Sequence, residues 1–187
     1  MTGERWRCFV AVPIDERLRT ELRSAAEDWP RLDGLRWTDP VGWHITLAFL
    51  GRMEATAVPS VAERLASVVD RHGPIPTRTG GLGAFPAPAR ARVAWYGVED
   101  GLGQIERLVQ GVAAALDLDV PKTLRPHVTL ARAQRRPVDL RAWLAAARAP
   151  AGAMVVDRVS LLRSHLEADP VRYEALSTIS LGVRPRV

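Results

Sequence analysis

Apolar residues along the chain alternate between two spacings, the twofold repeat of a β-strand and the repeat of roughly 3.6 of an amphipathic helix. Runs rich in Val, Ile, Thr and aromatic residues predict strands over residues 7–14, 35–38, 44–51, 75–82, 92–98 and 126–132. Apolar residues at helical spacing predict helices over about 16–29, 57–72, 101–116 and 137–147. Two further alternating runs, 154–165 and 171–183, predict a β-hairpin near the C-terminus.

Polar residues, Gly and Pro indicate where several of these elements begin and end. Asp15 stands at the N-cap position of the first helix, and Pro30 follows that helix. We expect the strand that starts at His44 to end at Gly51. The stretch 83–90 is rich in Pro and Gly, which predicts a loop carrying one large aromatic side chain, Phe85.

Two of the predicted strands carry nearly the same pentapeptide. Residues 44–48 and 127–131 both fit His-x-Thr-Leu-Ala, and the two copies lie 127 − 44 = 83 positions apart. Because successive side chains of a strand point to opposite faces, His44 shares a face with Thr46, and His127 shares one with Thr129. The opposite face of each strand is apolar enough to be buried. The spacing predicts two similar lobes that each supply half of one site.

Paired imidazoles and hydroxyls suit acid–base chemistry on a phosphodiester. One histidine can donate a proton while the other accepts one, because imidazole titrates near neutral pH. Thr46 and Thr129 can donate hydrogen bonds to phosphate oxygens. A nearby Arg132 would add positive charge, but strict alternation from His127 puts it on the wrong face, so it joins the site only if the strand bends or ends near Ala131.

The role of the Phe85 side chain stays open. Phe85 is placed either to stack on a nucleobase or to pin its own loop.

A zinc ion would need three or four convergent ligands, and the sequence offers no His-x-His, no His-Glu-x-x-His and one cysteine. We therefore expect neither a metal nor a cofactor.

Composition narrows the class of protein. A chain of 187 residues with 47% hydrophobic residues suits one folded domain of two packed lobes. The net charge is +5 and all but one of the basic residues are arginine, which suits phosphate recognition but also fits codon bias in a GC-rich genome. The single cysteine, Cys8, excludes an intrachain disulfide and favours a reducing cytosol. No signal segment and no apolar run long enough to span a bilayer is evident, so we expect a cytoplasmic protein with no membrane partner.

The two pentapeptides resemble the signature motifs of the two-histidine (2H) phosphoesterases. The resemblance is strongest to the bacterial RNA 2',3'-cyclic phosphodiesterase branch, long called 2'-5' RNA ligases. It extends over nearly the whole chain, through Arg7-Cys8-Phe9-Val10-Ala11-Val12, Phe49-Leu50-Gly51, Gly81-Leu82-Gly83-Ala84-Phe85-Pro86, Val93-Ala94-Trp95, Leu161-Leu162-Arg163-Ser164 and Tyr173-Glu174-Ala175-Leu176.

The resemblance implies a bilobal α+β fold over residues 1–187, in which two antiparallel sheets line a central cleft and helices lie outside. It implies hydrolysis of an RNA 2',3'-cyclic phosphate to a 2'-phosphate without a metal ion. By the same resemblance His44 is the proton donor and His127 the proton acceptor, and Thr46 and Thr129 hold the phosphate oxygens. We expect a monomer whose partner is an RNA end or a nucleotide cyclic phosphate.

Other activities at the same residues stay open. The chain could act on small nucleotide cyclic phosphates, or join tRNA halves reversibly through a 2'-5' bond. A third alternative, from a different class, is a non-catalytic module that binds RNA ends. Intact histidines and threonines at all four motif positions argue against that third alternative.

Overall fold

The computed structural model describes residues 3–120 and 124–182. The α-helices in these residues are α1 (Glu16–Glu27), α2 (Val58–Val69), α3 (Gln104–Ala115) and α4 (Arg141–Ala146). The strands are β1 (Arg5–Pro13), β2 (Leu35–Trp37), β3 (His44–Glu54), β4 (Ile75–Phe85), β5 (Val93–Glu99), β6 (His127–Ala133), β7 (Gly152–Val156), β8 (Arg158–His165) and β9 (Arg172–Ser180). The fold is therefore α+β, as the sequence predicts.

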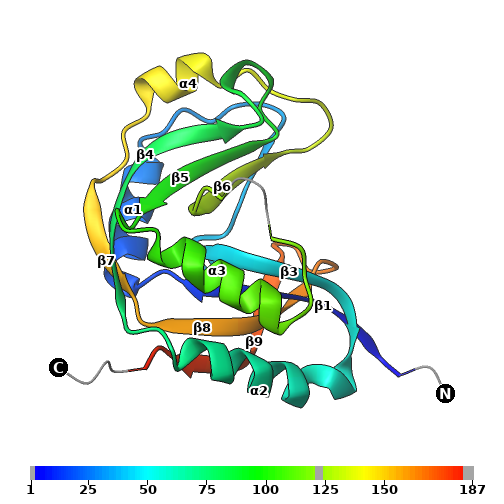
Figure 1. The fold of residues 1–187 in the computed structure, drawn as a ribbon. Coiled ribbons are helices and arrows are strands. Elements are labelled where there is room, and N and C mark those ends of the chain that lie inside the picture. Colours follow the sequence, from blue (N-terminus) through cyan, green and yellow to red (C-terminus); the bar gives the residue numbers. More distant parts are fainter. Residues whose placement is uncertain (1–2, 121–123, 183–187) are drawn as a thin grey trace.

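The strands form one curled antiparallel sheet with two halves (Figure 1). One half contains β7, β4, β5 and β6, with β2 added on β6, and the other contains β3, β1, β8 and β9. The halves join where β3 lies beside β6, through the Cα pair Ile45 and Val128. The two expected sheets are thus continuous, and their junction lies between the two motif strands.

The main core lies between the sheet and the helices. Leu18 of α1, Leu65 of α2 and Leu108 of α3 are at most 1% exposed and pack with inward residues of β1, β3 and β6. A smaller apolar cluster on the opposite face of the sheet consists of Phe9, Ala11 and Leu162, with Tyr173 packed against it. Residues on both faces of β1 are therefore buried, and the strand lies inside its half of the sheet because it pairs with β3 on one side and β8 on the other.

The first helix shows how local sequence sets an element boundary. Asp15 has an extended backbone and its side chain accepts a hydrogen bond from the Leu18 backbone N–H at 2.7 Å. The predicted N-cap is confirmed.

Among the described residues, none of the helices combines the length and the apolar content needed to cross a membrane.

Two strand ends differ from the sequence prediction. β3 does not end at Gly51 but continues to Glu54, because Gly51 adopts a φ of 71° beside an irregularity in its pairing with β1. β4 continues beyond residue 82 to Phe85, because Gly83 pairs with Trp95 and Phe85 with Val93. Phe85 therefore ends a strand instead of lying in a loop.

The C-terminal third holds two further corrections. The run 154–165 is not one strand: it divides at Asp157 into β7, which pairs with β4, and β8, which pairs with β1. The chain changes from one half of the sheet to the other at that residue. The helix expected from residue 137 begins only at Arg141 as α4, because Val138 forms a bridge with Ala91. The hairpin itself is present and consists of β8 and β9.

Candidate active site

The two motif strands bring their polar residues to one place at the junction of the sheet halves. His44 is the first residue of β3, and His127 is the first residue of β6. Because β3 and β6 are antiparallel and Ile45 pairs with Val128, continuing the register by one residue each way sets His44 opposite Thr129 and Thr46 opposite His127. All four residues are half-buried, whereas the motif residues between and after them, Ile45, Leu47, Val128 and Leu130, are buried. The alternation predicted from the sequence is observed.

Both imidazoles are held in the same way. Nδ1 of His44 donates to the Gly42 carbonyl at 2.7 Å, and Nδ1 of His127 donates to the Arg125 carbonyl at 2.7 Å. A carbonyl oxygen can only accept, so the proton of each neutral ring lies on Nδ1. Nε2 of each ring then carries a lone pair and can accept a proton when the ring is neutral. When the ring is protonated, Nε2 carries a hydrogen and can donate it. This arrangement prepares each histidine to accept or donate one proton at Nε2.

Aromatic rings enclose each histidine. The His44 ring lies 4.8 Å from Phe9 and 5.1 Å from Tyr173, centroid to centroid. The His127 ring lies 5.1 Å from Phe85 and 6.2 Å from Trp95. These aromatic rings displace water from the imidazoles.

The electrostatic consequence is the same for both histidines. Burial lowers the pKa of His44 and of His127 below the ordinary value, because a charged ring loses hydration. The carbonyl acceptors on Nδ1 act in the opposite direction, and the positive charge of Arg132 lowers both pKa values further. In the case of His44, the charge of His127 also lowers the pKa.

Three cavities in the described part of the chain are lined by a motif histidine, and one of them, of about 290 Å³, is lined by His44, Trp43 and Tyr173 among others. The other two are neighbours. A cavity of about 150 Å³ is lined by His44, Arg132 and Tyr173, among others, and one of about 470 Å³ is lined by His127 and Phe85. Thr46 and Phe49 line both cavities, so the two are adjacent. A wider cavity of about 780 Å³, between α1 and β7 to β9, contains neither motif histidine, so volume alone does not locate the chemistry.

Thr129 sits between the two histidine environments. It pairs across strands with Trp95, and its carbonyl accepts a hydrogen bond from the Thr38 hydroxyl at 2.8 Å. Among the described residues that line the two cavities, Thr129 is absent, whereas Thr46 lines both. The structure thus places Thr129 on the motif face but less openly than Thr46.

A bulge in β6 brings Arg132 to the motif face. Ala94 pairs with Ala131 and Trp95 pairs with Thr129, which leaves Leu130 as an extra residue. Leu130 and Ala131 are consecutive and both are fully buried, so the alternation shifts by one position there. Arg132 consequently lines the cavity that contains His44 and Thr46. The strand bend that the sequence left as a condition is present.

Several aromatic residues of the site were not identified from the sequence. Phe9, Trp95 and Tyr173 come from β1, β5 and β9, and their approach to the histidines depends on the order of strands in the sheet. Phe49 lies five residues after His44, where strict alternation predicts the buried face, so the sequence offered no signal for it, yet the structure leaves its side chain 67% exposed and lining both cavities. An exposed Phe on a motif strand favours a contact with a ligand.

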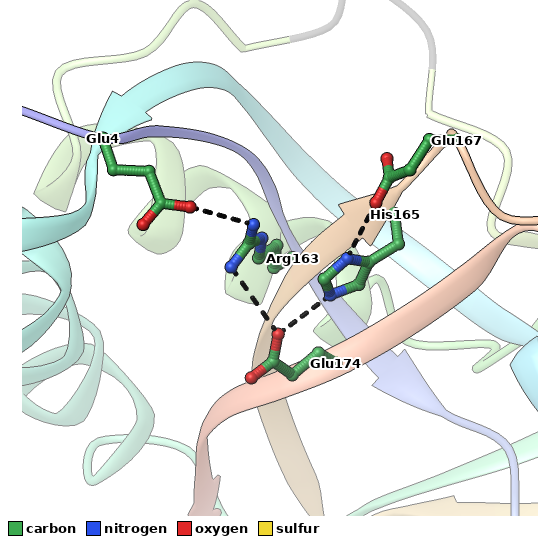
Figure 2. A network of polar contacts seen from close by, with 5 residues as sticks. All are labelled: Glu4, Arg163, His165, Glu167 and Glu174. Carbon is green, nitrogen blue, oxygen red and sulfur yellow. Dashed lines mark hydrogen bonds and ion pairs between the residues drawn. The ribbon is translucent and has the colours of Figure 1, made fainter.

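A network of polar contacts joins side chains on and near the hairpin of β8 and β9, namely Glu4, Arg163, His165, Glu167 and Glu174 (Figure 2). Ser164 and Tyr173 pair across β8 and β9 and line the His44 cavity. Behind them, the Arg163 guanidinium lies 3.2 Å from Glu4 and 4.0 Å from a Glu174 carboxylate oxygen.

The third histidine of this region belongs to the same network. Nδ1 of His165 lies 3.1 Å from Glu167, and Nε2 lies 2.9 Å from Glu174. Both ring nitrogens of His165 are therefore engaged, whereas among residues 3–120 and 124–182 only Nδ1 of each motif histidine has a hydrogen-bond partner. The network connects β8, β9 and the segment before β1.

A metal site is not evident in the described part of the chain. Within residues 3–120 and 124–182, no three His, Cys, Asp or Glu side chains converge as ligands would. Cys8 is buried in β1, and burial raises the pKa of its thiol, so it is a core residue.

Comparison with known proteins identifies the family. A family model described as LigT like phosphoesterase matches residues 12–95, a range that contains the first motif. A protein of Archaeoglobus fulgidus named RNA 2',3'-cyclic phosphodiesterase is 32% identical over 133 residues, which cover 70% of this chain and 74% of that protein. A protein of the same name from Aeropyrum pernix is 31% identical over 160 residues, covering 82% of this chain and 90% of that protein.

Solved structures share the fold. A crystal structure of a Thermus thermophilus protein is 26% identical, with a TM-score of 0.76, and the match covers 96% of this chain and 100% of that one. Escherichia coli LigT complexed with 3'-AMP gives a TM-score of 0.72 at 19% identity, covering 95% of this chain and 99% of that chain, which shows likeness of fold. With both motifs on one sheet face and relatives of this identity and coverage, the chain belongs to the LigT-like phosphoesterases, the 2H family that includes the RNA 2',3'-cyclic phosphodiesterases.

Proposed function

We propose that this protein hydrolyses RNA 2',3'-cyclic phosphodiester ends to 2'-phosphomonoesters without a metal ion. The observation that carries the proposal is the matched pair of imidazoles on adjacent motif strands, each anchored at Nδ1 by a backbone carbonyl at 2.7 Å, which leaves Nε2 of each ring to exchange a proton. The names of the related proteins support the substrate class.

In the proposed reaction His127 is the base and His44 is the acid. Nε2 of neutral His127 takes a proton from water as the water oxygen attacks phosphorus. The bond between phosphorus and the 3' oxygen breaks, and Nε2–H of protonated His44 gives its proton to that oxygen. The products are a 2'-phosphomonoester and a free 3' hydroxyl, and the two histidines have exchanged protonation states.

Three side chains would stabilise charge on the phosphoryl group. The hydroxyls of Thr46 and Thr129 would donate hydrogen bonds to the non-bridging oxygens. The guanidinium of Arg132 would add a charge-assisted contact, which the bulge in β6 makes geometrically accessible. The anionic phosphate would also raise the pKa of both buried histidines, which helps His44 to carry its proton in the complex.

Phe85 is proposed as a wall for the terminal base. Its ring packs on Trp95, with centroids 5.2 Å apart, and it lines the cavity beside His127. The contact with Trp95 pins the ring, and a pinned ring is a good stacking surface. The two roles that the sequence left open are therefore compatible.

The functional unit is proposed to be a monomer formed by residues 1–187 as one bilobal domain in the cytoplasm. Support comes from the junction of the sheet halves, where one chain contributes both motifs. Action on nucleotide cyclic phosphates and reversible 2'-5' ligation would use the same residues, and a comparison of substrates separates them.

The test is incubation of the protein with an RNA that ends in a 2',3'-cyclic phosphate, in the presence of a chelator, followed by identification of the product end. We expect a 2'-phosphate. The variants His44→Ala and His127→Ala should produce almost none, although their thermal unfolding should match that of the wild type. Binding of the RNA end without turnover would show a non-catalytic module and refute the proposal. A 3'-phosphate product would refute the assigned leaving group.

A further inference from the structure

Two arginines lie directly opposite each other beside the candidate active site. Arg36 of β2 pairs across strands with Arg132 of β6, so their side chains start about 5 Å apart on one face. Like charges in directly opposed positions destabilise a sheet unless another group compensates them. The pair therefore favours an anion between or beyond the two guanidinium groups.

The two arginines are not neutralised to the same degree. Arg132 forms no ion pair among the described residues. Arg36 forms one with Asp169, at 2.6 Å, and the two side chains are 49% and 88% exposed. An ion pair this exposed contributes little and is readily exchanged for another anion.

Both arginines line one cavity of about 170 Å³. That cavity shares Arg132, Leu166 and Tyr173 with the cavity that contains His44, so the two are neighbours with Arg132 at their border. Asp39 adds a carboxylate to the lining, where it accepts a hydrogen bond from the Val41 backbone N–H at 2.9 Å. The lining carries two guanidinium groups and one carboxylate, so it becomes net positive once a ligand anion displaces Asp169 from Arg36.

We propose that this cavity binds the phosphate on the 5' side of the terminal nucleotide, with Arg36 as the residue that recognises it. The inference rests on the proposed function. At a 2',3'-cyclic end the 2' and 3' oxygens are both occupied by the cyclic phosphate, so the RNA chain leaves the catalytic cavity only through its 5' phosphate. The positive cavity that adjoins Arg132 and His44 is placed to receive that phosphate.

The proposal gives the site a preference that the paired histidines alone do not supply. Arg132 contacts the cyclic phosphate, and Arg36 exchanges Asp169 for the phosphodiester one nucleotide away. The protein then favours RNA ends over cyclic mononucleosides, which lack a 5' phosphate. Arg36 is a specificity residue in this scheme and takes no part in the proton transfers.

Calorimetric binding of two product-like ligands tests the proposal without any turnover. The ligands are adenosine 2'-monophosphate and adenosine 2',5'-bisphosphate, which differ by the 5' phosphate alone. The wild type should bind the bisphosphate about three- to tenfold more tightly, the range expected for a partly exposed charge-assisted contact. Arg36→Ala should remove this difference and leave the affinity for the monophosphate unchanged.

Arg64→Ala is the matched control. Arg64 of α2 pairs with Asp117 at 2.5 Å, and these side chains are 45% and 83% exposed, close to the values for Arg36 and Asp169. This variant loses the same charge and a similar ion pair, yet it should keep the preference for the bisphosphate. Asp169→Asn, which frees Arg36, should increase that preference.

The outcomes separate this inference from the proposed function. Equal affinity of the wild type for the two ligands, or equal weakening of both ligands by Arg36→Ala, would overturn the subsite. Loss of the preference in Arg64→Ala as well would show a general effect of net charge and would also overturn it. The proposed function is judged separately, by hydrolysis of the cyclic RNA end, and its failure would leave the binding ratios interpretable.

Discussion

Gly83→Ala tests how the wall behind His127 is built. Gly83 of β4 pairs with Trp95 of β5, and a Cβ at residue 83 would stand 2.1 Å from Cζ2 of the indole. Ordinary contact begins near 3.4 Å, so the ring would have to move by about 3.4 − 2.1 = 1.3 Å. The indole lies 5.2 Å from Phe85 and 6.2 Å from His127, so its movement disturbs both.

The expected cost follows from overpacking. Forcing an extra carbon against a rigid ring lowers the free energy of unfolding by about 1–3 kcal/mol. For a chain of this length that corresponds to a fall in Tm of about 2–12 °C. Displacement of His127 by a fraction of the same shift should lower kcat/KM on a cyclic-phosphate RNA by about 10- to 100-fold.

Differential scanning calorimetry and steady-state kinetics measure the two effects, with Gly152→Ala as the control. A Cβ at residue 152 would meet its nearest atom at 3.4 Å, so this variant should stay within about 0.5 kcal/mol of wild type. In a Trp95→Leu background the added Cβ of Gly83→Ala should cost much less, because the ring is gone. Unchanged Tm and kcat/KM in Gly83→Ala, or an equal loss with and without Trp95, would refute the reasoning.

Three other predictions concern charge at the site. Because burial lowers the pKa of both motif histidines below 6.5, the bell-shaped profile of kcat/KM should have its optimum on the acid side of pH 6.5, and an optimum above pH 7 would contradict this. Arg132→Gln should lower kcat by about 10²-fold in steady-state assays and move both limbs of the profile to higher pH, because the charge that lowers both pKa values is lost. Activity should survive exhaustive chelation, and recovery of lost activity on adding a divalent ion would contradict a metal-free mechanism.

The sequence was sufficient where a feature depends on local periodicity. Alternation placed His44 with Thr46 and His127 with Thr129, and the N-cap at Asp15 is observed. These features depend on neighbours within a few residues, which the sequence contains directly.

Features that depend on strand partners could not be obtained in this way. The bulge at Leu130 that turns Arg132 to the site exists only against β5, and the division at Asp157 exists because β7 and β8 pair with different strands. The ring of Tyr173 reaches His44 because the hairpin closes one end of the sheet. A periodic pattern contains no information on which strands become neighbours, so these residues required the structure.

The central claim is that His127 accepts one proton and His44 donates one proton during the reaction. The most direct measurement is the pH profile of kcat/KM for wild type, His44→Ala and His127→Ala on an RNA with a 2',3'-cyclic end. Each variant should lose about 10²- to 10⁴-fold in kcat. The residual activity of His127→Ala should lack the acidic limb, and that of His44→Ala should lack the alkaline limb. Near-normal turnover in either variant, or a flat wild-type profile with chemistry rate-limiting, would contradict the account.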